Sequence, residues 1–412
     1  MIKAKPCLLA AFVPVAVAIV YLLLRLVISH GELVPSIEDR SPKDRIPELP
    51  TCSGQPDGGV CVVSRRWDAD LVRLRLEGND FQVWTEADQI IFACRRDAER
   101  MFLNGGLQTL MGRIRSTDLW IVAIRIVGLP EAALSYSFVD PGKQGADIGS
   151  DIGQDSVHIW RGPDAPPEPA YNDPLQGSLV EHTLGSVYLK TDRRITVYVP
   201  PQHQRGRELP CVYMADGHML ADFARFVEPL IESGALPPLL LVGVHAADPR
   251  SPADEDLRAA EYLEVAGSAR FGAHMRFFTE EVTRWCEDVY QATTDPTQRV
   301  VFGVSNGAAF VLSLGLSQPS MATTIVAFSV AGGQPTAERV PPLRCYLLAG
   351  TLETAIHRNT AEWATHLSES EDVELVFRAR VAGHDRLLWR EELPRALLWV
   401  FRATQTDGIP IY

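Results

Sequence analysis

The stretch RVVFGVSNGAAFVLSLGL, residues 299–316, decides the fold class of this chain. A short β-branched run passes into an apolar helical pattern through the turn Gly303-Val304-Ser305-Asn306-Gly307. A G-x-S-x-G turn exposes a serine where a buried strand meets a helix, and its glycines leave room for a strained backbone. The helix N-terminus stabilises negative charge beside that serine. The stretch therefore predicts Ser305 as a nucleophile and the Asn306 amide as a donor to an oxyanion.

Strand-like runs alternate with helical patterns on both sides of this turn. Several runs are apolar throughout, as expected for a parallel sheet covered on both faces. Helical patterns occupy residues 272–291 and 385–401. The alternation predicts a doubly wound α/β domain over residues 178–405. Its seven predicted strands lie within residues 193–200, 209–217, 238–246, 299–307, 323–333, 344–350 and 373–383.

The preceding part of the chain has a different pattern. Short runs at 71–78, 81–86, 120–128 and 134–140 alternate with period two or are rich in β-branched and aromatic residues. Closely spaced turn residues separate them, which predicts an antiparallel β-sandwich over residues 65–162. Proline-rich residues 163–177 form the predicted connector to the α/β domain, and polar residues 31–64 the predicted spacer before the sandwich.

The first thirty residues indicate a membrane segment. Lys3 and Lys5 precede an apolar run from Cys7 to Leu24 that is long enough to span a bilayer. The lysines favour an orientation that places the rest of the chain outside the cytoplasm, in the periplasm or at the cell surface. We expect residues 1–30 to be a signal anchor; a cleaved signal peptide and a secreted protein are the alternative.

Export permits disulfide bonds. Cys52 and Cys61 flank a turn rich in glycine, proline and aspartate and are the favoured pair, with two free thiols as the alternative. Cys211, Cys286 and Cys345 lie in apolar contexts and are predicted to be packed thiols.

A serine nucleophile needs a base and an acid that follow it in the chain. His384 lies between the last predicted strand and the last helix, where that base belongs. His357 and His366 also follow Ser305, but both fall in a helical pattern and are predicted to lie on a helix surface. Glu353 follows the strand CYLLAG and is the predicted acid.

Three other carboxylates compete for the role of the acid. Glu371 and Asp372 precede a strand rather than follow one, which favours a solvated position. Asp385 is adjacent to His384 and is predicted to cap the last helix. A second oxyanion donor is expected from the loop Asp216-Gly217-His218, through the amides of Gly217 and His218; a simple Asp-Gly turn is the alternative.

Composition excludes several classes of partner. The formal net charge of −13 argues against nucleic acid, because phosphate binding needs a basic surface. The seven cysteines include no C-x-x-C pair, which argues against a zinc site. We expect no cofactor and no metal, a small-molecule ester as substrate, and the membrane as partner of the N-terminal segment. The oligomeric state is not indicated.

With these residues in place, the chain resembles the enterochelin (enterobactin) esterase-like branch of the α/β-hydrolases over roughly residues 65–402. The resemblance rests on RRITVYVPP, YMADG, RAAEYL, FFTEEVTRWCEDVY, GVSNGAA, LAGTLE and GHDRLLWREEL. It implies an immunoglobulin-like sandwich before an α/β-hydrolase domain. Family members often have a second glycine where Ala308 stands, and some work without the acid.

The resemblance implies a serine esterase that cleaves cyclic triserine catecholate siderophores in iron acquisition. Arg258, Arg270 and Arg276 lie in the segment that covers such sites in relatives, so they are the expected contacts to an anionic substrate. Other relatives remove feruloyl or acetyl groups from plant-wall sugars, and a carbohydrate esterase is the alternative. An acyltransferase and a non-catalytic binding protein are the remaining readings.

Overall fold

A computed structural model describes residues 49–54, 59–140, 157–201, 203, 206–247, 256–335 and 340–401. The chain divides into two units, residues 1–47 and 48–412, and every described residue belongs to the second. The predicted anchor or signal at 1–30 and most of the predicted spacer lie outside the described residues. Within the described part, no helix has the length and apolar character needed to cross a membrane.

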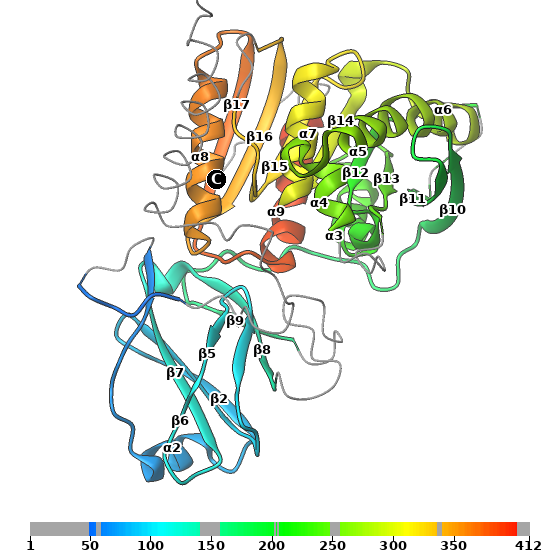
Figure 1. Cartoon of the computed structure of the whole chain (residues 1–412). Helices are drawn as coiled ribbons and strands as arrows, with labels where there is room; N and C mark the ends of the chain where they lie inside the picture. Colours follow the sequence, from blue (N-terminus) through cyan, green and yellow to red (C-terminus); the bar gives the residue numbers. More distant parts are fainter. Residues whose placement is uncertain are drawn as a thin grey trace, which may run out of the picture. The chain divides into compact units, whose positions relative to one another are not determined.

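An eight-stranded sheet forms the centre of the second half of the chain. Its strand order is β10-β11-β13-β12-β14-β15-β16-β17 (Figure 1). The strands from β13 to β17 in this order pair in parallel, whereas β11 is antiparallel to both of its neighbours. The bounds are β10 Ser178–Ser186, β11 Thr191–Val199, β12 Cys211–Ala215, β13 Leu240–Val244, β14 Arg299–Val304, β15 Thr324–Phe328, β16 Leu343–Gly350 and β17 Val373–Arg380.

The seven predicted strands of this region are present. The eighth, β10, was not predicted, because SLVEHTLGS is polar at alternate positions and mostly exposed. It pairs only with β11 at the edge of the sheet, so it needs no continuous apolar run.

Helices cover both faces of the large sheet (Figure 1). On β12, Tyr213 packs with Phe310 in one core while Val212 and Met214 pack with Phe223 in the other, because successive strand side chains point to opposite faces. The helices are η6 Gly217–Met219, α3 Leu220–Glu232, α4 Leu257–Tyr262, α5 Glu264–Arg276, the π-helical turn η7 Phe277–Val282, α6 Thr283–Tyr290, η8 Pro296–Gln298, α7 Asn306–Ser317, α8 Thr354–Ser368 and α9 Arg386–Phe401.

Residues 60–140 and 157–161, which we call the two-sheet region, form two antiparallel sheets. One sheet has the order β1-β7-β3-β2 with β6 paired to β7, and the other has the order β5-β4-β8-β9. Phe92 of the first sheet and Tyr136 of the second belong to one buried core. The bounds are β1 Val60–Val62, β2 Phe81–Glu86, β3 Gln89–Arg95, β4 Phe102–Gly105, β5 Thr109–Leu110, β6 Gly112–Arg113, β7 Leu119–Ile126, η4 Leu129–Glu131, β8 Ala133–Val139 and β9 His158–Arg161.

Two expectations for this part of the chain were wrong. Residues 71–78 do not form a strand; helix α2 spans Ala69–Leu76, and its buried side chains are Val72 and Leu76, one helical turn apart. The predicted spacer 31–64 contains strand β1, which pairs with β7 through Val60 and Val62.

The states of these cysteines agree with the predictions made from the sequence. Cys52 and Cys61 form a disulfide with their Cα atoms 5.1 Å apart, which joins the strand β1 to the segment before it. Cys211, Cys286 and Cys345 are buried free thiols, as predicted.

Candidate active site

Ser305 lies at the tight turn between β14 and α7. Its backbone has φ 57° and ψ −126°, a strained conformation for a residue with a side chain. The turn needs glycine, because a Cβ on Gly303 would lie 2.1 Å from the Gly307 carbonyl oxygen. The amide of Asn306, the first residue of α7, is one of the helix N–H groups that lack a partner within the helix.

His384 links Ser305 to Glu353. Its Nε2 lies 3.1 Å from the Ser305 Oγ, and its Nδ1 lies 2.5 Å from a carboxylate oxygen of Glu353. Because a carboxylate accepts at Nδ1, the proton belongs on Nδ1 and Nε2 is the acceptor for the serine hydroxyl. The structure thus brings together the three residues that the sequence singled out.

The Glu353 carboxylate is buried and held in place. Its Oε1 accepts hydrogen bonds of 2.6 Å from both the Ser329 hydroxyl and the Gly350 amide. The Trp389 indole N–H donates to Ser329 Oγ at 2.9 Å, and its ring lies edge-on to His384 at 4.9 Å. Ser329 and Trp389 were not predicted; only the position of Ser329 at the end of a parallel strand could have indicated it.

The competing residues do not join this network. Glu371 and Asp372 are exposed ahead of β17, and His357 and His366 lie on α8, as predicted. Asp385 caps α9, since its Oδ1 accepts from the Leu388 amide at 3.0 Å.

The predicted oxyanion loop lies beside the serine turn. Asp216 follows β12 in the left-handed conformation, and Gly217 and His218 begin the short helix η6. A Cβ on Gly307 would lie 3.0 Å from an Asp216 carboxylate oxygen, so the loop and the start of α7 are in contact. Gly217 is itself required, because a Cβ there would lie 2.4 Å from the Gly243 carbonyl oxygen.

The predicted arginine contacts need correction. Arg258 lines the cavity at Ser305, but its guanidinium makes two hydrogen bonds of 2.7 Å to Asp216 and supports the oxyanion loop. Arg270 bonds to the buried Glu261, and Arg276 bonds to Glu280 on the surface. Neither Arg270 nor Arg276 lines the cavity, since Arg270 bonds back to Glu261 of α4 and Arg276 bonds forward to Glu280 of η7.

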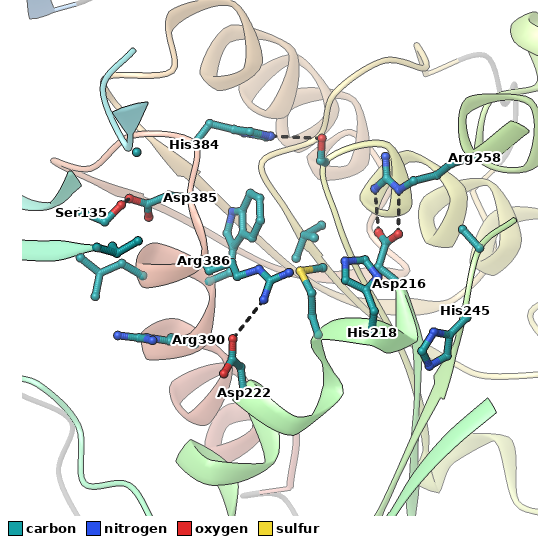
Figure 2. A pocket seen from close by; sticks show the side chains of 18 of the residues that line it. Ser135, Asp216, His218, Asp222, His245, Arg258, His384, Asp385, Arg386 and Arg390 are labelled. Carbon is teal, nitrogen blue, oxygen red and sulfur yellow. Dashed lines mark hydrogen bonds and ion pairs between the residues drawn. The ribbon is translucent and has the colours of Figure 1, made fainter. Parts of the chain in front are cut away.

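A cavity of about 960 Å³ opens in front of Ser305. Figure 2 shows His384, His218 and Arg386 around it, and Ser135 of β8, which also lines it, beside Asp385. Six arginines and four aspartates contribute to its lining, which spans the large sheet and the two-sheet region. They are Arg193, Arg194, Arg225, Arg258, Arg386 and Arg390, and Asp192, Asp216, Asp222 and Asp385.

Two of these arginines have no carboxylate partner among the described residues. Arg194 donates to the Nδ1 atom of His245 at 3.1 Å, and Arg390 lies over the Phe226 ring. Burial, together with the charge of Arg194, lowers the pKa of His245 to about 4. His245 is therefore neutral at pH 7, and the two guanidiniums supply positive charge at the cavity wall. The sequence showed no pattern that marks Arg194 or Arg390.

The strand order, the serine turn and the positions of His384 and Glu353 define an α/β-hydrolase. The family model for esterases, described as "Putative esterase", matches residues 186–400. The chain belongs to this esterase family, a class of hydrolases. No curated protein matches the sequence.

Solved structures share the fold at low sequence identity. The enterobactin esterase of Shigella flexneri, solved in the presence of enterobactin, is 18% identical with a TM-score of 0.61, covering 80% of this chain and 98% of its own. The ferric enterobactin esterase of Salmonella typhimurium is 16% identical with a TM-score of 0.60, covering 81% and 99%. The chain is thus an enterochelin esterase-like α/β-hydrolase in fold.

Proposed function

We propose that this protein is a serine esterase in which Ser305, His384 and Glu353 form the catalytic triad. The observation that carries the proposal is the continuous hydrogen-bonded path from the Ser305 hydroxyl through His384 to the buried Glu353. A serine hydroxyl becomes a useful nucleophile when a neutral imidazole accepts its proton and a carboxylate orients that imidazole.

The reaction then has two halves. Ser305 Oγ attacks the ester carbonyl as His384 Nε2 takes the hydroxyl proton, and the oxyanion accepts from the Asn306 amide and from the loop at Gly217 and His218. The C–O bond to the alcohol breaks, the alcohol leaves with the proton from His384, and an acyl-enzyme remains. Water, deprotonated by His384, attacks the acyl-enzyme and releases the acid.

We propose an anionic ester, of the siderophore catecholate type, as substrate. Six arginines and four aspartates line the cavity, and even with Arg193 paired to the buried Glu261 the lining favours negative charge, although the whole chain carries −13. Arg194 and Arg390 are the arginines best placed for this, since their charge is not balanced by a carboxylate of the described residues. The fold shared with proteins named for enterobactin supports the same choice.

A carbohydrate esterase gains no support from the two-sheet region. Binding of sugar by stacking would need exposed flat rings on that region. Its exposed large apolar side chains in the described residues are aliphatic: Leu71, Leu74, Val127, Val157 and Ile159.

The catalytic assignment is tested with a short-chain nitrophenyl ester. Ser305→Ala is expected to lower kcat by about 10⁴-fold or more. The control, Ser313→Ala, removes a hydroxyl from the same helix outside the cavity and keeps wild-type turnover. Equal turnover by wild type and Ser305→Ala would overturn the assignment. Mass spectrometry of the quenched enzyme should find the acyl group on Ser305.

The substrate class is tested by product analysis. We expect ferric and iron-free triserine catecholates to give linear fragments and free acid, and Arg390→Gln to raise KM for these anions but not for a neutral ester. Faster cleavage of a feruloyl sugar ester than of the triserine catecholates would instead identify the protein as a carbohydrate esterase. Transfer of the acyl group to an added alcohol in preference to water would identify an acyltransferase.

We further propose that the N-terminal apolar segment anchors the protein with its catalytic part outside the cytoplasm. The disulfide between Cys52 and Cys61 supports this location, because such bonds persist in oxidising compartments. Cell fractionation and protease treatment of intact cells test it. A full-length chain in the cytosolic fraction would contradict both the anchor and export.

A further inference from the structure

The loop that carries His384 is held by the two-sheet region as well as by the large sheet. This loop joins β17 to α9 and covers residues 381–385. The Ala133 amide at the start of β8 donates to the Val381 carbonyl at 3.2 Å. Two residues further along β8, the Ser135 hydroxyl donates to Asp385 Oδ2 at 2.5 Å (Figure 2). The two contacts lie at the two ends of the loop, with His384 between them.

Backbone packing closes the middle of the loop. A Cβ on Gly383 would lie 1.6 Å from the Gly106 carbonyl oxygen, so the two backbones touch. A Cβ on Gly106 would lie 2.6 Å from Asp385 Oδ2. The Gly106 amide donates to the Ser135 carbonyl at 3.0 Å, which holds this turn of the two-sheet region against β8. The residues on either side of His384 therefore have little freedom to move.

Asp385 connects this contact to helix α9. Its Oδ1 accepts from the Leu388 amide and caps the helix, while its Oδ2 accepts from Ser135. Burial raises the pKa of Asp385, so its charge depends on these donors. Helix α9 also carries Trp389, whose ring packs edge-on against His384. Loss of the Ser135 hydroxyl would weaken both the anchor of the loop and the start of the helix behind the imidazole.

His384 itself has few other constraints. Its side chain is 33% exposed on the cavity side, and its ring contacts are Ser305, Glu353 and Trp389. A base must stay within hydrogen-bond reach of its nucleophile, and a shift of about 1 Å can cost up to about 100-fold in rate. Because Nε2 and Ser305 Oγ are already 3.1 Å apart, a small outward shift of His384 would break their hydrogen bond.

We infer that Ser135 of the two-sheet region is a positioning residue for catalysis: its hydrogen bond to Asp385 sets the place of His384. The two-sheet region therefore contributes to turnover of any ester, including an ester too small to contact the two-sheet region. This inference rests on the proposed serine mechanism.

The test is Ser135→Ala in the full chain, assayed with a short nitrophenyl ester. We expect kcat to fall about 10- to 100-fold with KM changed less than about twofold, because binding of a small ester does not use the His384 loop. Ser135→Thr keeps the donor and is expected to restore most of kcat. Gly106→Ala pushes on Asp385 Oδ2 from the other side and is expected to lower kcat in the same way.

Ser186→Ala is the matched control. Ser186 is 8% exposed, like Ser135, and its hydroxyl donates a hydrogen bond of 2.6 Å to the Glu281 carboxylate. Ser186 does not line the cavity. Its loss costs a similar hydrogen bond, so stability falls while kcat stays within about twofold of wild type. Thermal unfolding of each variant is measured to check that the assay temperature lies below its unfolding transition.

The outcomes separate this inference from the proposed function. Wild-type turnover that disappears in Ser305→Ala, together with an unchanged kcat in folded Ser135→Ala, would overturn the positioning role alone. An equal loss of kcat in Ser135→Ala and Ser186→Ala would also overturn it, because the effect would then be general destabilisation. Wild-type turnover that survives in Ser305→Ala would instead overturn the serine mechanism.

Discussion

At the residue scale, Glu353 has both carboxylate oxygens in use. Oε2 contacts His384 Nδ1, and Oε1 accepts from Ser329 and Gly350. A carboxylate accepts at all of these positions, whereas an amide has one donor end that would face either a donor or the imidazole. The site therefore requires an acid at this position rather than a polar group of similar shape.

Replacing Glu353 tests this requirement. Glu353→Gln is expected to lower kcat by about 10²- to 10⁴-fold with little change in KM, because the amide favours the wrong imidazole tautomer. Steady-state kinetics with a nitrophenyl ester measure the split. Glu371→Gln and Asp372→Asn change the exposed competitors and should match wild type. Comparable losses in either one would give the role of the acid to that residue.

At the scale of an element, helix α2 shows how end signals override an alternating pattern. Residues 72–76 alternate apolar and basic side chains, which favours a strand by period alone. Asp68, however, accepts from the amides of Asp70 and Leu71 and caps a helix. Two turns later, Glu77 ends the helix in the left-handed conformation. In this helix Leu71 and Leu74 remain 64% and 71% exposed, so two apolar side chains stay in contact with solvent.

The contribution of the Asp68 cap of α2 to the free energy of unfolding should be measurable. Asp68→Ala is expected to lower the free energy of unfolding by about 1 kcal/mol, because two helix amides lose their acceptor. Asp70→Ala removes an exposed pair with Arg73 and should cost only about 0.3 kcal/mol. Urea denaturation followed by circular dichroism compares the two. A loss in Asp68→Ala no larger than in Asp70→Ala would show that the cap contributes nothing.

At the scale of the whole molecule, one buried histidine makes stability depend on pH. His274 is fully buried beside Phe277, Phe278 and Phe310, and its Nδ1 lies 3.8 Å from the buried Glu261 carboxylate. Neither ring nitrogen has a hydrogen-bond partner among the described residues. Burial lowers its pKa to about 3. Between about pH 6.5 and pH 3, the unfolded chain binds a proton here that the folded chain does not. Acid therefore destabilises the fold over this range.

Replacing His274 should flatten this dependence. As pH falls from 6 to 4.5, wild type is expected to lose up to about 1.4 kcal/mol per pH unit more stability than His274→Phe. Urea midpoints at several pH values measure the difference. His357→Gln removes a partly exposed histidine and should follow the wild-type slope. Parallel curves for wild type and His274→Phe would mean that His274 already carries its proton in the fold.

Much of this protein is determined by sequence alone, because the signals are local. Each predicted strand of the large sheet is one apolar run, and parallel strands end at one edge. Chain order therefore sufficed to predict that Ser305, Glu353 and His384 lie together. The disulfide joins cysteines only nine residues apart. The edge strand β10 was missed because its alternate polar residues leave no continuous apolar run. The helix α2 was missed because its alternating apolar and basic residues imitate the period of a strand.

Only the tertiary structure decided which partner each polar side chain takes. Arg258 donates to Asp216, which lies 42 residues away in the sequence. Ser135 reaches Asp385 across 250 residues, so no spacing in the sequence could indicate the contact. Such pairs depend on the packing of one region against another, which brings together groups whose local sequences carry no information about each other. The proposed nucleophile can be recognised from its own turn, whereas the contacts that support the proposed base are visible only in the folded chain.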